Sequence, residues 1–392
     1  MNVYDELGIG SLISARSFST KLGGAPLPLE VIDAMREAAG HCVRMDRLQD
    51  AASKLIAEVT GAEAGLVSSG ASAALTLGTA ACLAGFDVGR MNRLPDTTGI
   101  PNQVVVHRSH RNDYDHALRA AGAQLVDVGF SYYTFAYEVE ESISDQTAAL
   151  FYQAGGDGFA LPFAEFVRIA HKYGKPVIVD SAAELPPVRN LRAFIEDGAD
   201  LVAFSGGKHI RGPQSTGILC GRADLIQSAA LQHQDMDNFP ESWPLRSWIA
   251  EGRLAGPPHH GVGRGFKVGK EEIAGLMAAL RRYSQRDFAA ELRGWMADMQ
   301  CIVDAASGRP GVRAELRFPQ PNGREIPHAV LTVDAVAGVS AVDVVLALQE
   351  GTPPIFVFER HAREGVIVFM PEALIPGQAQ AIAARLNEIL SR

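Results

Sequence analysis

The chain has 392 residues, 47% of them hydrophobic, and a net charge of −9, values that are ordinary for a globular enzyme of two or three domains. The acidic charge argues against nucleic acid as a partner, because binding phosphates requires a basic surface. The four cysteines form no CxxC pair, the N-terminus has no apolar signal sequence and no apolar run is long enough to span a membrane. We therefore expect a cytoplasmic protein with neither disulfides nor a metal site.

Apolar residues alternate between helical and strand spacing along the first 220 residues. Residues 1–30 are rich in turn formers and are expected to form an irregular arm, and helices are expected at 29–39 and 46–60. After a first strand before Ser68, strands are expected at 104–106, 125–128, 148–152, 176–180, 201–204 and 218–221. This alternation predicts an α/β domain with a mainly parallel sheet covered by helices on both faces.

The second half of the chain changes character at a segment rich in glycine and proline, from Gln232 to Arg264, which is typical of a hinge or flap. The adjacent His259 and His260 point in different directions, which favours a loop over a metal site. Helices and strands then alternate in what we expect to be a small C-terminal α+β domain. We predict an N-terminal arm and helix (1–45), a large α/β domain (46–260) and the small domain (261–392).

A serine-rich turn joins the first strand to a long helix of small residues. Ser69, Gly70, Ala71 and Ser72 stand at the start of that helix. Free backbone N–H groups and the helix dipole favour a phosphate at such a position, and serine hydroxyls add donors. The alternative is that Ser69 or Ser72 simply caps the helix.

One lysine occupies an unusual position. The buried strand ending at Phe204 is followed by Ser205, two glycines and Lys208. A strongly hydrated lysine at the end of an apolar strand favours a functional role, and a desolvated lysine becomes a nucleophilic amine. We predict that Lys208 forms a Schiff base with pyridoxal 5'-phosphate (PLP); the alternative is a lysine in an ordinary strand-exit loop.

Other polar residues follow neighbouring strands and are therefore expected at the same edge of the sheet. Asp180, 28 residues before Lys208, could keep the ring nitrogen of PLP protonated. Ala182 would leave room for the ring, His110 could stack on it, and Ser205 could reach the phosphate. The alternatives are a turn-capping role for Asp180 and a surface-loop position for His110.

These motifs, together with Gly212-Pro213-Gln214 and the glycine-rich Gly263–Gly269 stretch, resemble fold-type I PLP enzymes. The similarity extends over nearly the whole chain and is to the selenocysteine synthase-like branch, which includes L-seryl-tRNA selenium transferase and D-glucosaminate-6-phosphate ammonia-lyase. The resemblance implies Lys208 as the PLP lysine, Asp180 at the pyridine nitrogen and sites shared between subunits of a homodimer or larger homo-oligomer. Selenocysteine synthases carry an additional N-terminal tRNA-binding domain, for which this sequence leaves no room before the arm motif.

We therefore expect a PLP-dependent lyase that acts on a small amino acid or amino sugar acid. The Lys208 Schiff base and a quinonoid would lead to α,β-elimination, with Arg264, Lys267 and Arg360 as candidates for binding a substrate anion. Each of these three could equally be a solvated or structural charge. The alternative reactions are racemisation or epimerisation and retro-aldol cleavage. A transferase acting on aminoacyl-tRNA and a PLP-binding protein without catalysis are the remaining possibilities.

Overall fold

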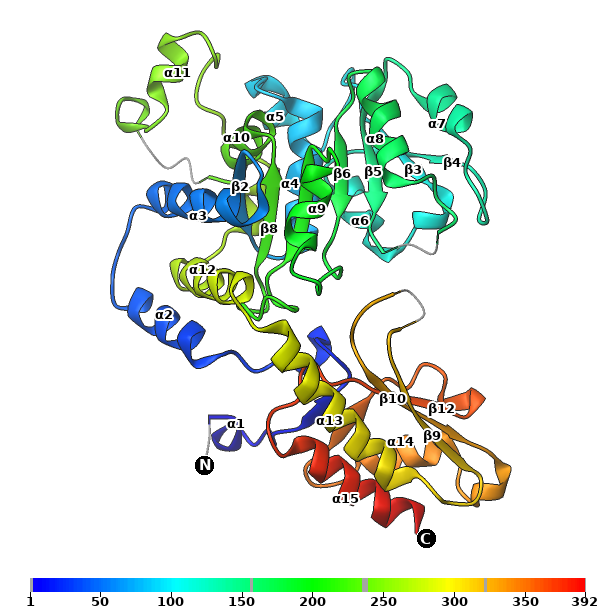
Figure 1. The fold of residues 1–392 in the computed structure, drawn as a ribbon. Helices are drawn as coiled ribbons and strands as arrows, with labels where there is room; N and C mark the ends of the chain where they lie inside the picture. Colours follow the sequence, from blue (N-terminus) through cyan, green and yellow to red (C-terminus); the bar gives the residue numbers. More distant parts are fainter. Residues whose placement is uncertain (1–2, 156–157, 235–238, 321–322, 392) are drawn as a thin grey trace. The chain divides into compact units, whose positions relative to one another are not determined.

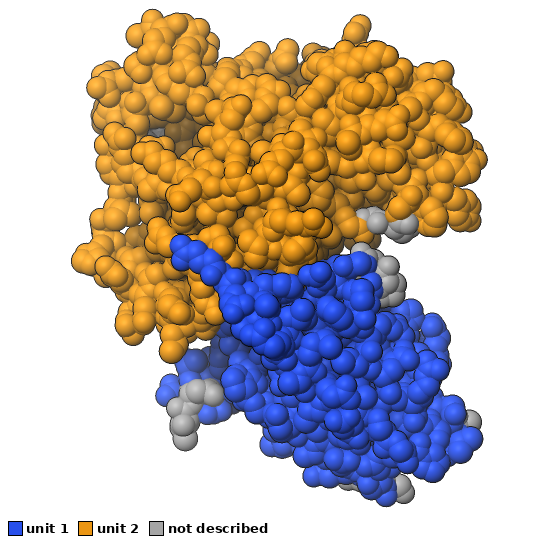
Figure 2. All heavy atoms as spheres, viewed as in Figure 1, with its two compact units in different colours: residues 1–26, 285–392 blue, residues 27–284 orange. Residues whose placement is uncertain are grey.

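The computed structural model describes residues 3–155, 158–234, 239–320 and 323–391. The chain divides into two compact units, shown in different colours in Figure 2. The larger unit comprises residues 27–284, and the smaller unit comprises residues 1–26 and 285–392. Within the described ranges, no helix has the length and apolar character needed to cross a membrane.

The limits of the two units differ from the boundaries expected from the sequence at both ends of the large domain. Helix α12 (Lys270–Ser284) packs against α2 (Leu29–Ala39) and α3 (Met45–Thr60). Val31 of α2 and Ile273 of α12 are fully buried in the same hydrophobic core. Because their apolar faces are covered by this core, both helices belong to the larger unit, whereas we expected them in the arm and in the small domain.

A seven-stranded sheet forms the centre of the larger unit (Figure 1). Its strand order is β2 (Ala64–Ser68), β8 (Gly217–Gly221), β7 (Leu201–Ser205), β6 (Val177–Asp180), β5 (Thr147–Gln153), β3 (Gln103–His107), β4 (Gln124–Val128). All neighbours pair in parallel except β8, which is antiparallel to both β2 and β7. The carboxyl ends of the other six strands therefore lie at one edge of the sheet.

Helices cover both faces of this sheet, as the sequence predicted. One face packs against α4 (Ala71–Ala84), α6 (His116–Ala120) and α10 (Ala223–Leu231). The other packs against α3, α8 (Phe163–Lys172), α9 (Asn190–Glu196) and α12. Helix α4 is made of small and apolar residues, and 11 of its 14 residues are buried. A helix that is apolar on all sides is stable only inside a protein, so its sequence places α4 against the sheet.

The remaining helices of the larger unit are α5 (Val88–Arg93), α7 (Ala136–Ser142) and α11 (Arg246–Ala250). The smaller unit contains α1 (Val3–Glu6), α13 (Phe288–Ala306), α14 (Ala341–Gln349) and α15 (Gln378–Leu390). Its antiparallel sheet has the order β12 (Val366–Phe369), β10 (His328–Val333), β9 (Val312–Arg317), and β1 (Ile13–Ala15) pairs in parallel with β11 (Ile355–Val357). Strand pairing with β11 thus makes the N-terminal arm part of this α+β unit.

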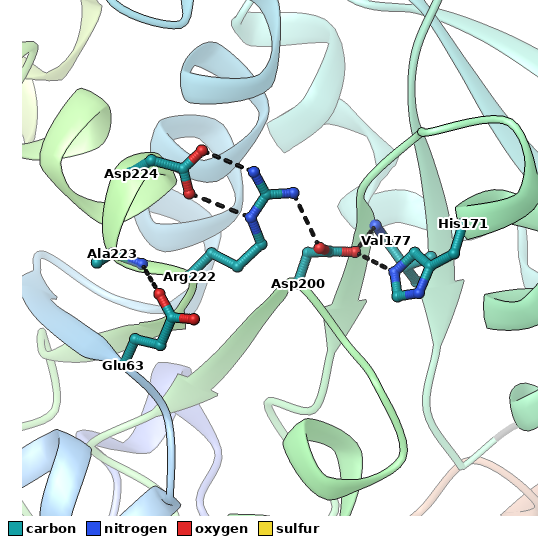
Figure 3. Close-up of polar contacts among 7 residues, drawn as sticks. All are labelled: Glu63, His171, Val177, Asp200, Arg222, Ala223 and Asp224. Carbon is teal, nitrogen blue, oxygen red and sulfur yellow. Dashed lines mark hydrogen bonds and ion pairs between the residues drawn. The ribbon is translucent and has the colours of Figure 1, made fainter.

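A buried carboxylate organises the amino-terminal edge of the large sheet, opposite the carboxyl ends of its parallel strands (Figure 3). Asp200 is 6% exposed and accepts hydrogen bonds from the Val177 amide and His171 Nε2, each at 2.8 Å, and from Arg222 Nη1 at 3.1 Å. Arg222 also binds Asp224. Asp200 thereby joins β6, β7, α8 and the turn after β8.

Replacing Asp200 with alanine should lower the free energy of unfolding by about 2–4 kcal/mol, because it leaves buried donors without an acceptor. Chemical denaturation of the purified variant measures this loss. Asp224→Ala is the matched control, since Asp224 is half-exposed and its pairing with Arg222 should contribute less than about 1 kcal/mol. Equal losses of unfolding free energy in the two variants would show that the buried network contributes no more to stability than the half-exposed pair does.

Candidate active site

The start of α4 lies at the carboxyl edge of the sheet. Ser68, the last residue of β2, and Ser205, the last residue of β7, both pair with Gly217 of β8. The N-cap of α4 is Gly70, with φ 99° and ψ 162°, and no side chain caps the helix. Capping by Ser69 or Ser72, the alternative considered above, is therefore not what the structure shows.

The uncapped helix start is shaped to receive a ligand. A Cβ atom built on Gly70 would meet no atom within 4 Å, whereas one built on Gly217 would collide with the Gly70 backbone. Ser69 is half-buried and Ser72 is exposed. The first N–H groups of a helix lack partners within the helix, so this position favours an anion such as a phosphate.

Replacing Gly70 with alanine should weaken PLP binding about tenfold or more, because a methyl group would enter the open space above the helix start. The positive φ adds strain of about 1–2 kcal/mol. Gly85, at the opposite end of α4, also has a positive φ (54°) and open space around a built Cβ, which makes Gly85→Ala the matched control. Titration of the cofactor-free proteins with PLP should show the loss for Gly70→Ala only.

Lys208 lies in a tight loop between β7 and β8. The Gly206 amide donates to the Thr216 carbonyl at 2.9 Å, and the Gly212 amide donates to the Gly206 carbonyl at 2.8 Å. A side chain on Gly206 would collide with Thr216, and one on Gly207 would come 2.6 Å from the Gln214 backbone. The glycines before Lys208 are therefore required by close packing rather than by a positive φ.

Asp180, at the end of β6, is 4% exposed, and the charge of Lys208 acts on its carboxyl. Burial raises the pKa of its carboxyl, while the Ala182 amide, which donates to Oδ1 at 2.9 Å, and the Lys208 charge act in the opposite direction. The bond from Ala182 shows that Asp180 also closes a local turn. Asp180 can therefore close this turn and, as predicted, also lie near Lys208.

His110 is buried, at 3% exposure, and is not a surface-loop residue. The Gln153 amide donates to His110 Nδ1 at 3.2 Å, which leaves the proton of the neutral imidazole on Nε2. Gln153 is the register partner of Asp180, and its side chain donates to the Asp180 carbonyl at 3.4 Å. His110 and Asp180 are therefore connected through the end of β5.

His107 also supports the carboxyl edge of the sheet, from the face opposite to the one that carries Asp180. It is fully buried, its Nε2 accepts the Leu161 amide at 3.3 Å, and its ring lies 4.8 Å from that of His110. Burial, together with the neighbouring His110, lowers the pKa of His107 to about 3. His107 therefore stays neutral at ordinary pH and acts as part of the scaffold.

The structure places the three predicted substrate-binding residues on different parts of the chain. Arg264 lies in the 3-10 helix Val262–Phe266, which packs on α4, and its charge helps to lower the pKa of His233. Lys267 is exposed at the end of this helix. Arg360 is exposed in the smaller unit. Their proposed role in binding a substrate anion stays a prediction, as do the individual cofactor-binding roles of the other predicted residues.

The structure adds two residues that the sequence reasoning missed. Gln153 directly follows an expected strand, so the strand-end signal that selected Asp180 could also have selected it. Ser181 is 1% exposed, and its hydroxyl has no hydrogen-bond partner in the described structure. A buried hydroxyl of this kind has an unmet hydrogen-bonding capacity beside the site.

These features together fit PLP. The open, uncapped start of α4 suits its phosphate, the buried Asp180 suits its ring nitrogen, and Lys208 suits its aldehyde. Ser205 lies at the end of β7. Because side chains alternate between the two faces of a strand, Ser205 and Asp180 both lie on the face of the sheet that α4 covers. A mainly parallel sheet with these groups at its carboxyl edge defines a fold-type I PLP-dependent enzyme.

Comparison with known proteins agrees with this class. A family model described as L-seryl-tRNA selenium transferase (SelA) matches residues 18–237. The chain is 33% identical to the 5'-C-glycyluridine monooxygenase-decarboxylase of a Streptomyces species, over 99% of the chain and 92% of the relative. It is 31% identical to the D-glucosaminate-6-phosphate ammonia lyase of Salmonella typhimurium, over 99% of the chain and 98% of the relative.

A solved structure of D-glucosaminate-6-phosphate ammonia-lyase has a TM-score of 0.83 and 30% identity to the chain, covering 100% of this chain and 98% of that one. The chain belongs to the L-seryl-tRNA selenium transferase family. Enzymes of this family and of the matching fold depend on PLP, so the cofactor and the resemblance predicted from the sequence are confirmed.

Proposed function

We propose that the chain is a PLP-dependent lyase that catalyses α,β-elimination on a small amino acid or amino sugar acid. The observation that carries this proposal is the buried Asp180 at the carboxyl edge of the sheet, at the end of the strand that neighbours the one leading to Lys208. The similarity to D-glucosaminate-6-phosphate ammonia lyase over nearly the whole of both chains supports elimination as the reaction.

The residues of the site have separate roles in this reaction. When bound, PLP supplies an electron sink for the bonds at the substrate's Cα. Lys208 would provide an amine to hold the cofactor's aldehyde carbon and a base to take the proton from Cα. Asp180 would hold a proton at the ring nitrogen, and the buried His110 would offer the flat face of its imidazole. The start of α4 would hold the phosphate and so orient the ring.

The test is to incubate the enzyme with D-glucosaminate 6-phosphate and with D- and L-serine, and to measure ammonia and 2-oxo acid. Elimination of a β-hydroxyl predicts that the two products form in equal amounts. In D₂O, inversion at Cα with deuterium uptake and no ammonia would identify a racemase or epimerase. Release of an aldehyde would identify retro-aldol cleavage, and either outcome would overturn the lyase proposal.

A second candidate is oxygen-dependent decarboxylation of an amino acid substrate. It is supported by the similarity to 5'-C-glycyluridine monooxygenase-decarboxylase, which also extends over nearly the whole of both chains. Oxygen consumption and CO₂ release, measured with 5'-C-glycyluridine, separate this reaction from elimination, which consumes no oxygen.

Three further predictions from the sequence remain proposals. The family resemblance supports a homodimer or larger homo-oligomer with sites at the subunit interface, and the composition supports a location in the cytoplasm and no nucleic-acid partner. Light scattering of the purified enzyme tests the first. Retention on immobilised tRNA at low salt would contradict the absence of a nucleic-acid partner.

A further inference from the structure

An unusual concentration of exposed aromatic side chains lies beside the active-site edge. We use the name aromatic edge for six residues: Phe130, Tyr132, Tyr133, Phe135, Tyr137 and Phe159. They make up six of the eleven exposed aromatic residues in the described part of the chain, and Tyr132 is 73% exposed. Exposing this much ring surface to water is unfavourable, so a cluster of this kind marks a binding surface.

The topology places these rings at the same edge of the sheet as Lys208 and Asp180. Residues 129–135 follow the carboxyl end of β4, and Phe159 follows the carboxyl end of β5, which pairs with β6. With strands about 4.8 Å apart, the end of β5 lies roughly 5 Å from that of β6, and the end of β4 roughly 14 Å away. The aromatic edge therefore extends sideways from the site along the sheet.

The rings form two sets of contacts, Tyr132 with Phe159 and, separately, Phe130, Tyr133, Phe135 and Tyr137 in a row. Tyr132, which follows β4, lies edge-on to Phe159, which follows β5, with centroids 6.2 Å apart. Phe130 and Tyr133 lie 5.5 Å apart, and a hydrogen bond from the Phe130 amide to the Tyr133 carbonyl closes their turn at 2.8 Å. A bound ring would therefore meet side chains that already contact one another.

The position and chemistry of the aromatic edge indicate what it binds. A three-carbon amino acid extends only about 4 Å from its Cα and does not reach from Lys208 to the residues after β4. A phosphate is disfavoured next to aromatic faces, which are electron-rich. Arg111, a cation next to these loops, is already paired with Asp115 and Asp127. Planar, uncharged rings stack well on aromatic side chains.

We propose that the natural substrate is an amino acid whose side chain carries a nucleoside, and that its base stacks on the aromatic edge through Tyr132 and Phe159. This inference rests on the proposed chemistry at Lys208, because it places the substrate's Cα there. It replaces the small substrate proposed above with a larger one that extends from the site along the carboxyl edge toward β4.

The test uses Tyr132→Ala and Phe159→Ala, with Tyr173→Ala as the control, because Tyr173 is an exposed aromatic residue at the end of α8. Binding is followed by the change in cofactor absorbance on titration with 5'-C-glycyluridine, D-glucosaminate 6-phosphate or D-serine. We expect each site variant to bind 5'-C-glycyluridine about tenfold more weakly, with its affinity for the two smaller compounds unchanged. Uridine alone should compete with 5'-C-glycyluridine in the wild-type enzyme and less well in the variants.

The inference is overturned if 5'-C-glycyluridine binds no more tightly than D-serine, or if the variants weaken all three ligands equally. It is also overturned if Tyr132→Ala changes the oligomeric state in light scattering, because a second copy of the chain would then cover the rings. Failure of the proposed function has a different signature: the wild-type enzyme would show ligand-induced changes in absorbance but release neither ammonia nor 2-oxo acid from any of the compounds.

Discussion

Replacing Lys208 with alanine should reduce turnover by about 10³-fold or more, since the substitution removes both the amine that holds the cofactor and the base that takes the Cα proton. The visible absorbance of the purified enzyme should be lost or shifted in the same variant. The fold should persist, because Lys208 is only half-buried and the loop around it is held by backbone hydrogen bonds of Gly206 and Gly212.

Lys208→Arg is the informative companion. Arginine preserves the positive charge beside Asp180 but cannot act as a nucleophilic amine, because its guanidinium stays protonated. We therefore expect the arginine variant to be as inactive as the alanine variant. Substantial activity in Lys208→Arg would show that the lysine serves only as a positive charge. Lys208 would then be an ordinary lysine in a loop after a strand, the alternative stated in the sequence analysis.

Replacing Asp180 with asparagine should lower turnover by about 10²-fold or more while leaving Lys208 in place, because the ring nitrogen of PLP would lose the carboxylate that keeps it protonated. Steady-state kinetics with the best substrate measures the loss. Asp113→Asn is the control, because Asp113 is an exposed carboxylate in the loop after β3 and should not influence turnover. Equal activity of both variants would assign Asp180 to turn capping alone.

Asp180 should also affect the stability of the cofactor-free protein. Burial raises its pKa above the usual value of 3.8, so the folded protein binds this proton more tightly than the unfolded chain does. Its contribution to stability is therefore fully present below pH 3.8 and is lost as the pH rises through the folded pKa. At neutral pH, cofactor-free Asp180→Asn should melt at a higher temperature than the wild type, and a lower melting temperature would contradict the raised pKa of the buried carboxyl.

The larger sheet and its site edge were largely predictable from the sequence. The pattern of short apolar strands that end in polar residues predicted both the parallel sheet and the position of Asp180, His110 and Lys208 at one edge of it. The signal is strong because strands buried on both faces are nearly continuous apolar runs, so that a polar residue marks the point where each strand ends.

Other features left no local signal. Strand β9 (Val312–Arg317) alternates charged and apolar residues on an exposed edge and was not expected. The pairing of β1 with β11, which makes the arm part of the smaller unit, depends on residues more than 300 positions apart. The packing of α12 onto α2 is equally non-local. Long-range pairing of this kind is decided by the whole core, and helical or strand periodicity alone does not reveal it.

The most direct test of the central claim is to reduce the purified enzyme with borohydride, digest it and locate the cofactor by mass spectrometry. Reduction makes the bond between PLP and an amine permanent. We predict a single labelled peptide with the cofactor on Lys208, and loss of the label in Lys208→Ala. A label on another lysine, or no label after addition of PLP, would contradict the assignment of this loop as the site of catalysis.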